Sequence, residues 1–329
     1  MTVTKISNPG LDSTVPRGSR NLIINGAMAI AQRGTVTGVT NGYGGPDRFV
    51  FAVTGAAVAT LSQDTDVPSG NGFVNSMKID ITTEDSSLAA SDVALIAQRI
   101  EGFNLQSIKK GTSSAEKLTV SFWIKTTITG TYILELFDSD NTRQVSASYS
   151  VSSANTWEKK TITMPADTTG ALDNDNATSL TILWFLAAGS TFTSGTLNTS
   201  WAANDNANRA VGQVNAVNST SNNIYFTGIQ MELGDTATDF EFQQRTQNLT
   251  ECQRYYFYNV GCLYGGQYGT RGFAGASCLP TTMRTTPTLN YTSVRTTTSL
   301  QAYVTPNSAQ YLMADTSPFV CGLVADSEL

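Results

Sequence analysis

The stretch "KLTVSFWIKT" at residues 117–126 decides the fold, together with "TYILELFD" at 131–138 directly after it. Alternation with a period of two turns successive side chains to opposite faces of a strand, and β-branched and aromatic residues favour that conformation. Similar segments recur along the chain: "DRFVFAV" (47–53), "WEKKTITM" (157–164), "SLTILWFLA" (179–187) and "NNIYFTGIQME" (222–232). Turn residues separate them. The pattern predicts an all-β protein, an antiparallel jelly-roll β-sandwich.

One internal segment is ambiguous between helix and strand. "TEDSSLAASDVALIAQRIEGF" contains the run "VALIAQRIE" at 93–101, which is compatible with a short helix as well as with a strand. We favour a strand that leads into a bend at Gly102.

The segment "NLIINGAMAIAQRG" at 21–34 imitates a secretion signal, because basic residues precede it and small residues end it. A signal needs an unbroken apolar run of about 7–15 residues, and Asn25-Gly26 interrupts this one. Asn-Gly is also a strong type I′ hairpin signal. We therefore predict two short strands, Leu22–Ile24 and Ala27–Gln32, joined by that turn, with a cleaved leader as the alternative.

The end of the sandwich is marked by "NLTECQRYYF", in which Asn248 and Glu251 have the spacing of a helix capping box. The residues after it return to short strands and glycine turns, which are typical of a small β domain. The prediction divides the chain into an extended N-terminal docking arm, a jelly-roll sandwich, a short linking helix and a small C-terminal β domain: residues 1–20, 21–245, 246–258 and 259–329.

Composition excludes several classes of function. The chain has 329 residues, of which 14% are charged, a net charge of −6 and no histidine. A nucleic-acid partner would need a clustered basic face, and a membrane span would need about 18 consecutive apolar residues. Without histidine, neither a Ser-His-Asp nor a Cys-His mechanism can be built from this chain. The cysteines have no metal-binding spacing and are expected to be free thiols, with disulfide pairing as the alternative: Cys252, Cys262, Cys278 and Cys321.

Several segments, taken together and in order, resemble tailed-bacteriophage virion proteins of the tail-fibre or receptor-binding family. They are "NLIINGAMAIAQRG", "DRFVF", "KLTVSFWIK", "ANTWEKKTITMPADTTG", "FTGIQMELGDTATDFEF", "ECQRYYF", "MRTTPTL" and "GLVADSEL". The resemblance implies a jelly roll similar to carbohydrate-binding modules, a small C-terminal β domain, a homotrimer and no catalytic residues. It also implies assembly in the host cytoplasm, for which no leader is needed.

The tryptophans are the first candidates for ligand contact, because a flat aromatic ring can stack on the apolar face of a sugar. Trp123 and Trp184 lie within apolar strands and are predicted to be core residues, while Trp157 is expected to cover an edge of the sandwich. Trp201 lies in the polar segment "NTSWAANDNANRA", which makes it the best ligand-binding candidate of the four.

Tyrosines near the C-terminal domain form the second group of candidates. Tyr264 and Tyr268 stand among glycines in "LYGGQYGTRGF" and are predicted to bind ligand on an exposed surface. Tyr255 and Tyr256 are instead expected to pack the linking helix against the sandwich or a neighbouring subunit.

Carboxylates complete the inventory, and no metal site or cofactor is predicted from them. "DNDN" (173–176) and "NDNAN" (204–208) are oxygen-rich, so structural calcium is an alternative, but Asn/Asp clusters also form turns without an ion. Asp47 and Glu232 are expected to pair with an arginine or a turn backbone in the scaffold. No pair of carboxylates is marked as a glycosidase pair, so we expect no enzymatic activity.

The expected function is that of a virion tail or appendage protein, a fibre or tip that binds host-surface polysaccharide for adsorption. Residues 1–20 would dock to other virion proteins, and the C-terminal domain would trimerise and present the outer surface. Two alternatives remain at this point. One is a purely structural cement, collar or baseplate component, and the other is a depolymerase.

Overall fold

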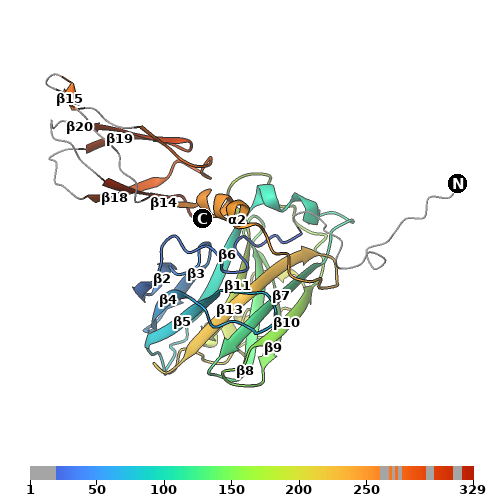
Figure 1. Ribbon diagram of the computed structural model, residues 1–329. Coiled ribbons are helices and arrows are strands. Elements are labelled where there is room, and N and C mark those ends of the chain that lie inside the picture. Colours follow the sequence, from blue (N-terminus) through green and yellow to red (C-terminus); the bar gives the residue numbers. More distant parts are fainter. Residues whose placement is uncertain (1–19, 260–266, 269–270, 273–275, 294–299, 314–320) are drawn as a thin grey trace.

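Antiparallel strands make up most of the computed structural model, which describes residues 20–259, 267–268, 271–272, 276–293, 300–313 and 321–329 (Figure 1). The predicted docking arm lies outside this part, except for Arg20. Every helix in the described ranges is too short or too polar to cross a lipid bilayer.

Two large sheets form the sandwich. The first has six strands in the order β1 (Val36–Val39), β4 (Val58–Asp64), β5 (Ser76–Thr83), β13 (Asn223–Leu233), β7 (Leu118–Thr126), β10 (Glu158–Met164). The second has seven, in the order β12 (Ala202–Ala203), β9 (Arg143–Val151), β8 (Gly130–Asp138), β11 (Thr178–Ala188), β6 (Val93–Glu101), β3 (Val50–Thr54), β2 (Asn41–Tyr43). Neighbouring strands are antiparallel throughout, and β13 lies between β5 and β7 although it is distant from both in sequence. The predicted all-β sandwich of jelly-roll type is confirmed.

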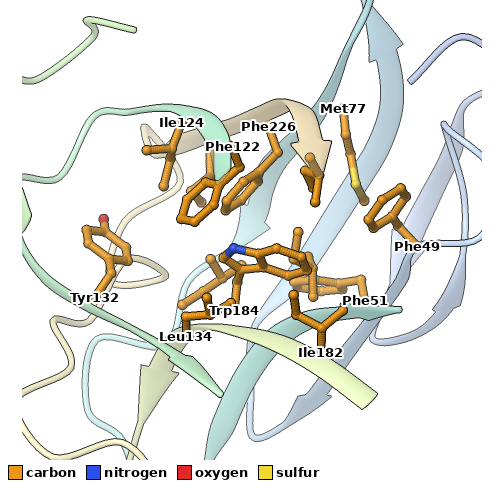
Figure 2. Close-up of a cluster of buried hydrophobic side chains, with 14 of the residues drawn as sticks. Phe49, Phe51, Met77, Phe122, Ile124, Tyr132, Leu134, Ile182, Trp184 and Phe226 are labelled. Atoms are coloured by element: carbon orange, nitrogen blue, oxygen red, sulfur yellow. The ribbon is translucent and has the colours of Figure 1, made fainter. Parts of the chain in front are cut away.

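The core lies between the sheets, because each sheet sends its inward-facing apolar side chains into the same space (Figure 2). The Phe122 ring of β7 lies 5.7 Å from the Trp184 ring of β11 and 6.1 Å from the Phe226 ring of β13. Trp184 is fully buried, as predicted. These three aromatic side chains join the two sheets at the centre of the sandwich.

The ambiguous segment is a strand, as we favoured. β6 pairs with β11 on one side and with β3 on the other, and Ile96 and Ile100 enter the core. The chain then bends through a short 3₁₀ turn, η2 (Gly102–Asn104). Its position in the middle of the sheet pairs the backbone groups of β3 and β11 as well as its own, whereas a helix there would leave the facing edges of those two strands unpaired.

The predicted hairpin around Asn25-Gly26 is wrong, because residues 22–32 form a buried irregular loop. A type I′ turn requires positive φ at both central residues, but here Asn25 (φ 62°) and Met28 (φ 58°) have it and Gly26 does not. The Asn25 side-chain amide donates to the Ile30 carbonyl at 2.8 Å and so closes the loop. Gly26 is needed for another reason, since a Cβ there would lie 2.0 Å from the Ile229 carbonyl oxygen.

The linking helix is shorter than predicted and begins earlier. α2 (Arg245–Gln253) has Gln244 as its N-cap, and Asn248 lies buried inside it, so the predicted capping box is wrong. The next strand, β14 (Tyr256–Asn259), begins within the range that we assigned to the helix. Three other short helical turns are η3 (Gln106–Ile108), α1 (Ser190–Thr193) and η4 (Asn206–Asn208).

The C-terminal part consists of small antiparallel sheets, as predicted for a small β domain. One contains β14, β21 (Cys321–Asp326) and β18 (Thr288–Ser293); a second contains β17 (Ala276–Cys278), β20 (Ser308–Met313) and β19 (Leu300–Thr305); the third pairs β15 (Gln267–Tyr268) with β16 (Arg271–Gly272). Cys252 is a buried free thiol. Cys262 and the side chains of Cys278 and Cys321 lie outside the described part, so their predicted state stays a prediction.

A buried ionic junction joins the sandwich to the end of the chain. The Arg48 side chain, 1% exposed, forms an ion pair with Glu328, whose side chain is 5% exposed. The Arg48 guanidinium also lies 3.4 Å from the centre of the Tyr255 ring, a cation–π contact. Arg33 extends the junction by pairing with Asp326 at 3.1 Å and with Glu328 at 3.2 Å.

The junction brings together segments that are widely separated in sequence. Arg33 comes from "NLIINGAMAIAQRG", Arg48 from "DRFVF", Tyr255 from "ECQRYYF" and Glu328 from "GLVADSEL". Tyr255 and Tyr256 are buried and lie against arginines of the sandwich, which confirms their predicted packing role.

The two carboxylates expected to support the scaffold do so. Asp47 accepts hydrogen bonds from the backbone and side-chain nitrogens of Gln32, at 3.0 and 2.7 Å. Glu232 accepts from the backbone N–H and the hydroxyl of Thr238, at 2.8 and 2.7 Å. Both are buried, so their hydrogen bonds hold turns in place.

Candidate functional site

The outer face of the six-stranded sheet carries aromatic and cationic side chains in a row across the strands. On β7, Phe122 and Ile124 point into the core, so Lys125 points to the opposite face. In the register, Tyr225 of β13 lies opposite Lys125 on one side and Lys78 of β5 on the other. Trp157 lies just before β10, beyond Lys125. We call Lys78, Tyr225, Lys125 and Trp157 the outer-face row.

Close contacts within the row fix its side chains against one another. The Lys125 ammonium lies 4.5 Å from the centre of the Tyr225 ring and 5.8 Å from the centre of the Trp157 ring. These two rings approach edge to face, with their centres 6.2 Å apart. The Lys78 ammonium lies 5.9 Å from the Tyr225 ring. Such cation–π and edge-to-face contacts are favourable, so the row is ordered without any ligand.

Asp66, in the loop that connects β4 to β5, holds two side chains of the row in place. Its carboxylate forms an ion pair with Lys125 and accepts the indole N–H of Trp157 at 2.9 Å. Burial acts to raise the pKa of Asp66, but the hydrogen bonds from Lys125 and Trp157 outweigh it, and the pKa is lowered. Asp66 is therefore charged at neutral pH and holds both partners in position.

The same loop covers the neighbouring part of the sheet. The Thr227 hydroxyl of β13 donates to the Asn75 carbonyl at 2.7 Å, and Phe73 lies over Gly228, where an added Cβ would be 2.5 Å from the ring. The loop therefore forms a border along one side of the row. Figure 1 shows its trace crossing in front of the sheet.

Trp123 lies beside the row and is not a core residue, which corrects our prediction. Its neighbours Phe122 and Ile124 fill the inward positions of β7, so Trp123 is half-buried on the outer face. There it lies opposite Lys159 of β10 in the register. The error arose because Phe122, Trp123 and Ile124 are apolar in succession. The alternation of the whole strand places Trp123 on the same outward face as polar Thr119, Ser121 and Lys125, and this signal was overlooked.

The predicted ligand residue Trp201 lies elsewhere and is held by the fold. It precedes β12, the edge strand of the other sheet; its indole N–H donates to the Pro165 carbonyl at 2.8 Å, and its half-buried ring packs against the core. The Lys110 ammonium lies 5.0 Å from its centre. Tyr264 lies outside the described residues, and so does the side chain of Tyr268, which belongs to β15.

The oxygen-rich loops use their carboxylates to hold turns. Asp205 accepts the Ala207 N–H at 3.1 Å and caps η4, and Asp175 accepts the Ala177 N–H at 2.9 Å. Within the ranges that the structure describes, no three Asp, Glu or Cys side chains are grouped as metal ligands would be.

A pocket, separate from the outer-face row, lies near the start of α2. This pocket of about 180 Å³ is lined largely by Phe73, Phe240 and Phe242, whose ring centres are 4.9 to 5.1 Å apart. Phe242 and Val74 at its wall are 53% and 69% exposed. The pocket can take an apolar side chain, while the outer-face row offers flat rings next to charges, which suits a polar ring with one apolar face.

No protein-family model matches the chain, and no curated protein matches it in sequence. Solved structures do match. They include the enzymatically active domain of bacteriophage CBA120 tailspike protein 4 (15% identity, 65% of this chain, 21% of that one, TM-score 0.36). A putative sugar-binding protein of Bacteroides thetaiotaomicron also matches, at 12% identity over 65% of this chain and 100% of that one, with a TM-score of 0.35. So does a family 11 carbohydrate-binding module of Clostridium thermocellum, at 12% identity over 61% of this chain and 95% of that one, with a TM-score of 0.30. The chain spans about a fifth of the tailspike domain, and these values assign it no ligand or activity.

The residues of the row were only partly visible in the sequence. Trp157 was expected at an edge of the sandwich, and Tyr225 was not singled out. The alternation in "NNIYFTGIQME" places Tyr225 on the face of the strand opposite to Ile224 and Phe226. This alternation was the signal in the sequence that Tyr225 points outward. What the sequence lacked was the register that aligns Tyr225 with Lys125 and brings both next to Trp157.

Proposed function

We propose that the protein is a structural component of a bacteriophage virion, a tail or appendage fibre or tip protein, and that it binds host-surface glycans through the outer-face row. The observation that carries the glycan proposal is the row itself, in which Asp66 and Lys125 hold Tyr225 and Trp157 in place. The virion proposal is supported by the ordered segments that resemble phage tail and receptor-binding proteins.

An ordered aromatic surface suits weak, repeated binding of sugars. A ring face covers the apolar face of a sugar, and nearby lysine and aspartate side chains reach its hydroxyls. Because the side chains are already held, little conformational entropy is lost when ligand binds. In the proposed homotrimer, several rows would engage one polysaccharide together and gain avidity. Residues 1–20 would attach the protein to the particle.

The protein is proposed to act by binding, without catalysis. Two deeply buried carboxylates of the other sheet are used for ion pairs: Glu101 contacts Arg254 at 2.6 Å and Glu135 contacts Arg209 at 2.6 Å. Burial raises the pKa of Glu135, although Arg209 opposes the shift. These groups support the scaffold and do not face the row.

The proposal is tested by replacing the two rings of the row. Trp157→Ala and Tyr225→Ala should each weaken binding to a bacterial polysaccharide array by about fivefold to tenfold, since an aromatic contact is worth roughly 1 kcal/mol. Neither ring belongs to the core, so the circular dichroism spectrum should not change. Tyr258→Ala is the matched control, because Tyr258 is an exposed tyrosine on β14, outside the row.

Two results would count against this proposal. The wild-type protein binding none of the polysaccharides would remove the glycan function. If the wild-type protein binds and both variants bind equally well, the glycan site is not at the row.

The alternative is a cement, collar or baseplate component that binds no receptor. The exposed Phe242 and Val74 at the aromatic pocket favour it, because exposed apolar surface of this kind is typical of protein contacts. A map of the virion separates the two: a tip protein projects the outer-face row into solvent, whereas a cement covers it with neighbouring chains.

A further inference from the structure

We infer that the glycan bound at the outer-face row carries an acidic group, a carboxylate or a phosphate, and that Lys159 beside Trp123 binds this group. The inference rests on the proposed function and adds a ligand class to it. Three observations carry it: the free charge of Lys159, its aromatic neighbour, and the separation of positive from negative charge along this face of the sheet.

Lys159 differs from the other lysines near it by having no carboxylate partner. It lies on β10, the last strand of its sheet, and its side chain is exposed. Lys160 contacts Glu158 at 2.5 Å and Lys125 is paired with Asp66, whereas Lys159 has no ion pair with any residue in the described ranges. Its ammonium group is therefore available to a ligand.

Trp123 gives this lysine a ligand-binding neighbour. The two residues lie opposite each other in the register, and directly opposed residues of antiparallel strands have Cβ atoms about 5 Å apart. A sugar ring stacked on Trp123 would therefore bring its substituents within reach of Lys159.

The outward positions around Trp123 contain no carboxylate. Ser121 and Lys125 flank Trp123 on β7, Thr227 lies opposite it on β13, and Thr161 follows Lys159 on β10. Asp66, from the loop between β4 and β5, reaches this region but is paired with Lys125, so the net positive charge beside Trp123 comes from Lys159.

The other end of the face is acidic. Burial raises the pKa of Tyr225, and the charges of Asp64, Asp66 and Asp80 raise it further, so these carboxylates lie near its hydroxyl. Lys78, which has no ion pair within the described ranges, lies at this acidic end, and Asp80 follows it on the same face of β5. A ligand with negative charge along its whole length would be repelled here, so the charge pattern favours a glycan with spaced acidic groups over a nucleic acid.

The experiment uses one bacterial polysaccharide array in three forms: native, carboxyl-reduced and dephosphorylated. We expect the full-length wild-type protein to bind acidic glycans and to lose that binding after one of the two treatments, which identifies the group. Lys159→Gln should weaken binding to acidic glycans about threefold to fivefold at each site, and more where several copies bind together. Lys159→Glu should weaken it further, while Lys109→Gln, in an exposed pair remote from the row, should not change it.

The possible results separate the two proposals. Equal binding to native and treated glycans, with no effect of Lys159→Gln, would overturn the acidic ligand class and leave the glycan function intact. Absence of binding to every form would overturn the glycan function itself. Equally tight binding of single-stranded DNA by the wild-type protein would contradict the argument from the acidic end of the row.

Discussion

Replacing Arg48 with leucine is expected to lower the free energy of unfolding by about 3–5 kcal/mol. Arg48 and Glu328 are both buried, and Arg48→Leu removes one of the two arginines that neutralise Glu328, which leaves this buried carboxylate with Arg33 alone. The variant also loses the cation–π contact with Tyr255. Urea unfolding followed by tryptophan fluorescence measures the loss, because all four tryptophans lie in the sandwich.

A double-mutant cycle shows whether the pair itself is responsible. Glu328→Leu should cost a similar amount, and the double variant Arg48→Leu/Glu328→Leu should recover part of the loss, since no uncompensated charge remains. Lys109→Leu is the control for an exposed pair, with side chains 52% and 41% exposed, and should cost at most about 1 kcal/mol. Equal losses for Arg48→Leu and Lys109→Leu would contradict the buried junction.

Trp184→Ala is expected to destabilise the sandwich by about 3–5 kcal/mol, the usual cost of removing a large aromatic side chain from a core. Trp184 is fully buried between the sheets, with Phe122 and Phe226 on the opposing one, and their rings cannot collapse completely into the space it leaves (Figure 2). Urea unfolding by circular dichroism measures the effect without relying on the lost fluorophore.

The control for this core variant is an aromatic residue on the surface. Phe103 is 53% exposed, so Phe103→Ala should change the free energy of unfolding by much less. If the two substitutions proved equally costly, Trp184 would not have the central packing role that its position gives it.

The sandwich could be predicted because apolar residues at every second position of a strand show which of its faces is buried. That signal is clear in β13, where Ile224 and Phe226 point inward and Tyr225 outward. At Trp123 the signal was overlooked, because three apolar residues in succession, Phe122 to Ile124, obscure the alternation of the whole strand. Prediction fails where tertiary contacts replace local preference: Asn25-Gly26 has the composition of a hairpin turn, but packing against Ile229 decides its conformation.

The candidate site was harder to predict than the fold. Trp201 was chosen because its neighbours in sequence are polar, and local polarity does not reveal the Pro165 carbonyl that binds its indole N–H. Trp157 and Tyr225 become neighbours only through the pairing of β13, β7 and β10. A site made of residues on different strands depends on register, which a single sequence does not contain.

The tryptophan indole N–H groups provide the most direct test of the central claim that glycan binds on the outer face of the six-stranded sheet. Nuclear magnetic resonance can follow them while the protein is titrated with an oligosaccharide from an array-positive polysaccharide, with assignments from single Trp→Phe variants. The indole signal of Trp157, and that of Trp123 beside it, should shift, while those of Trp184 and Trp201 should stay in place. A shift of the Trp201 signal with Trp157 unchanged would contradict the account.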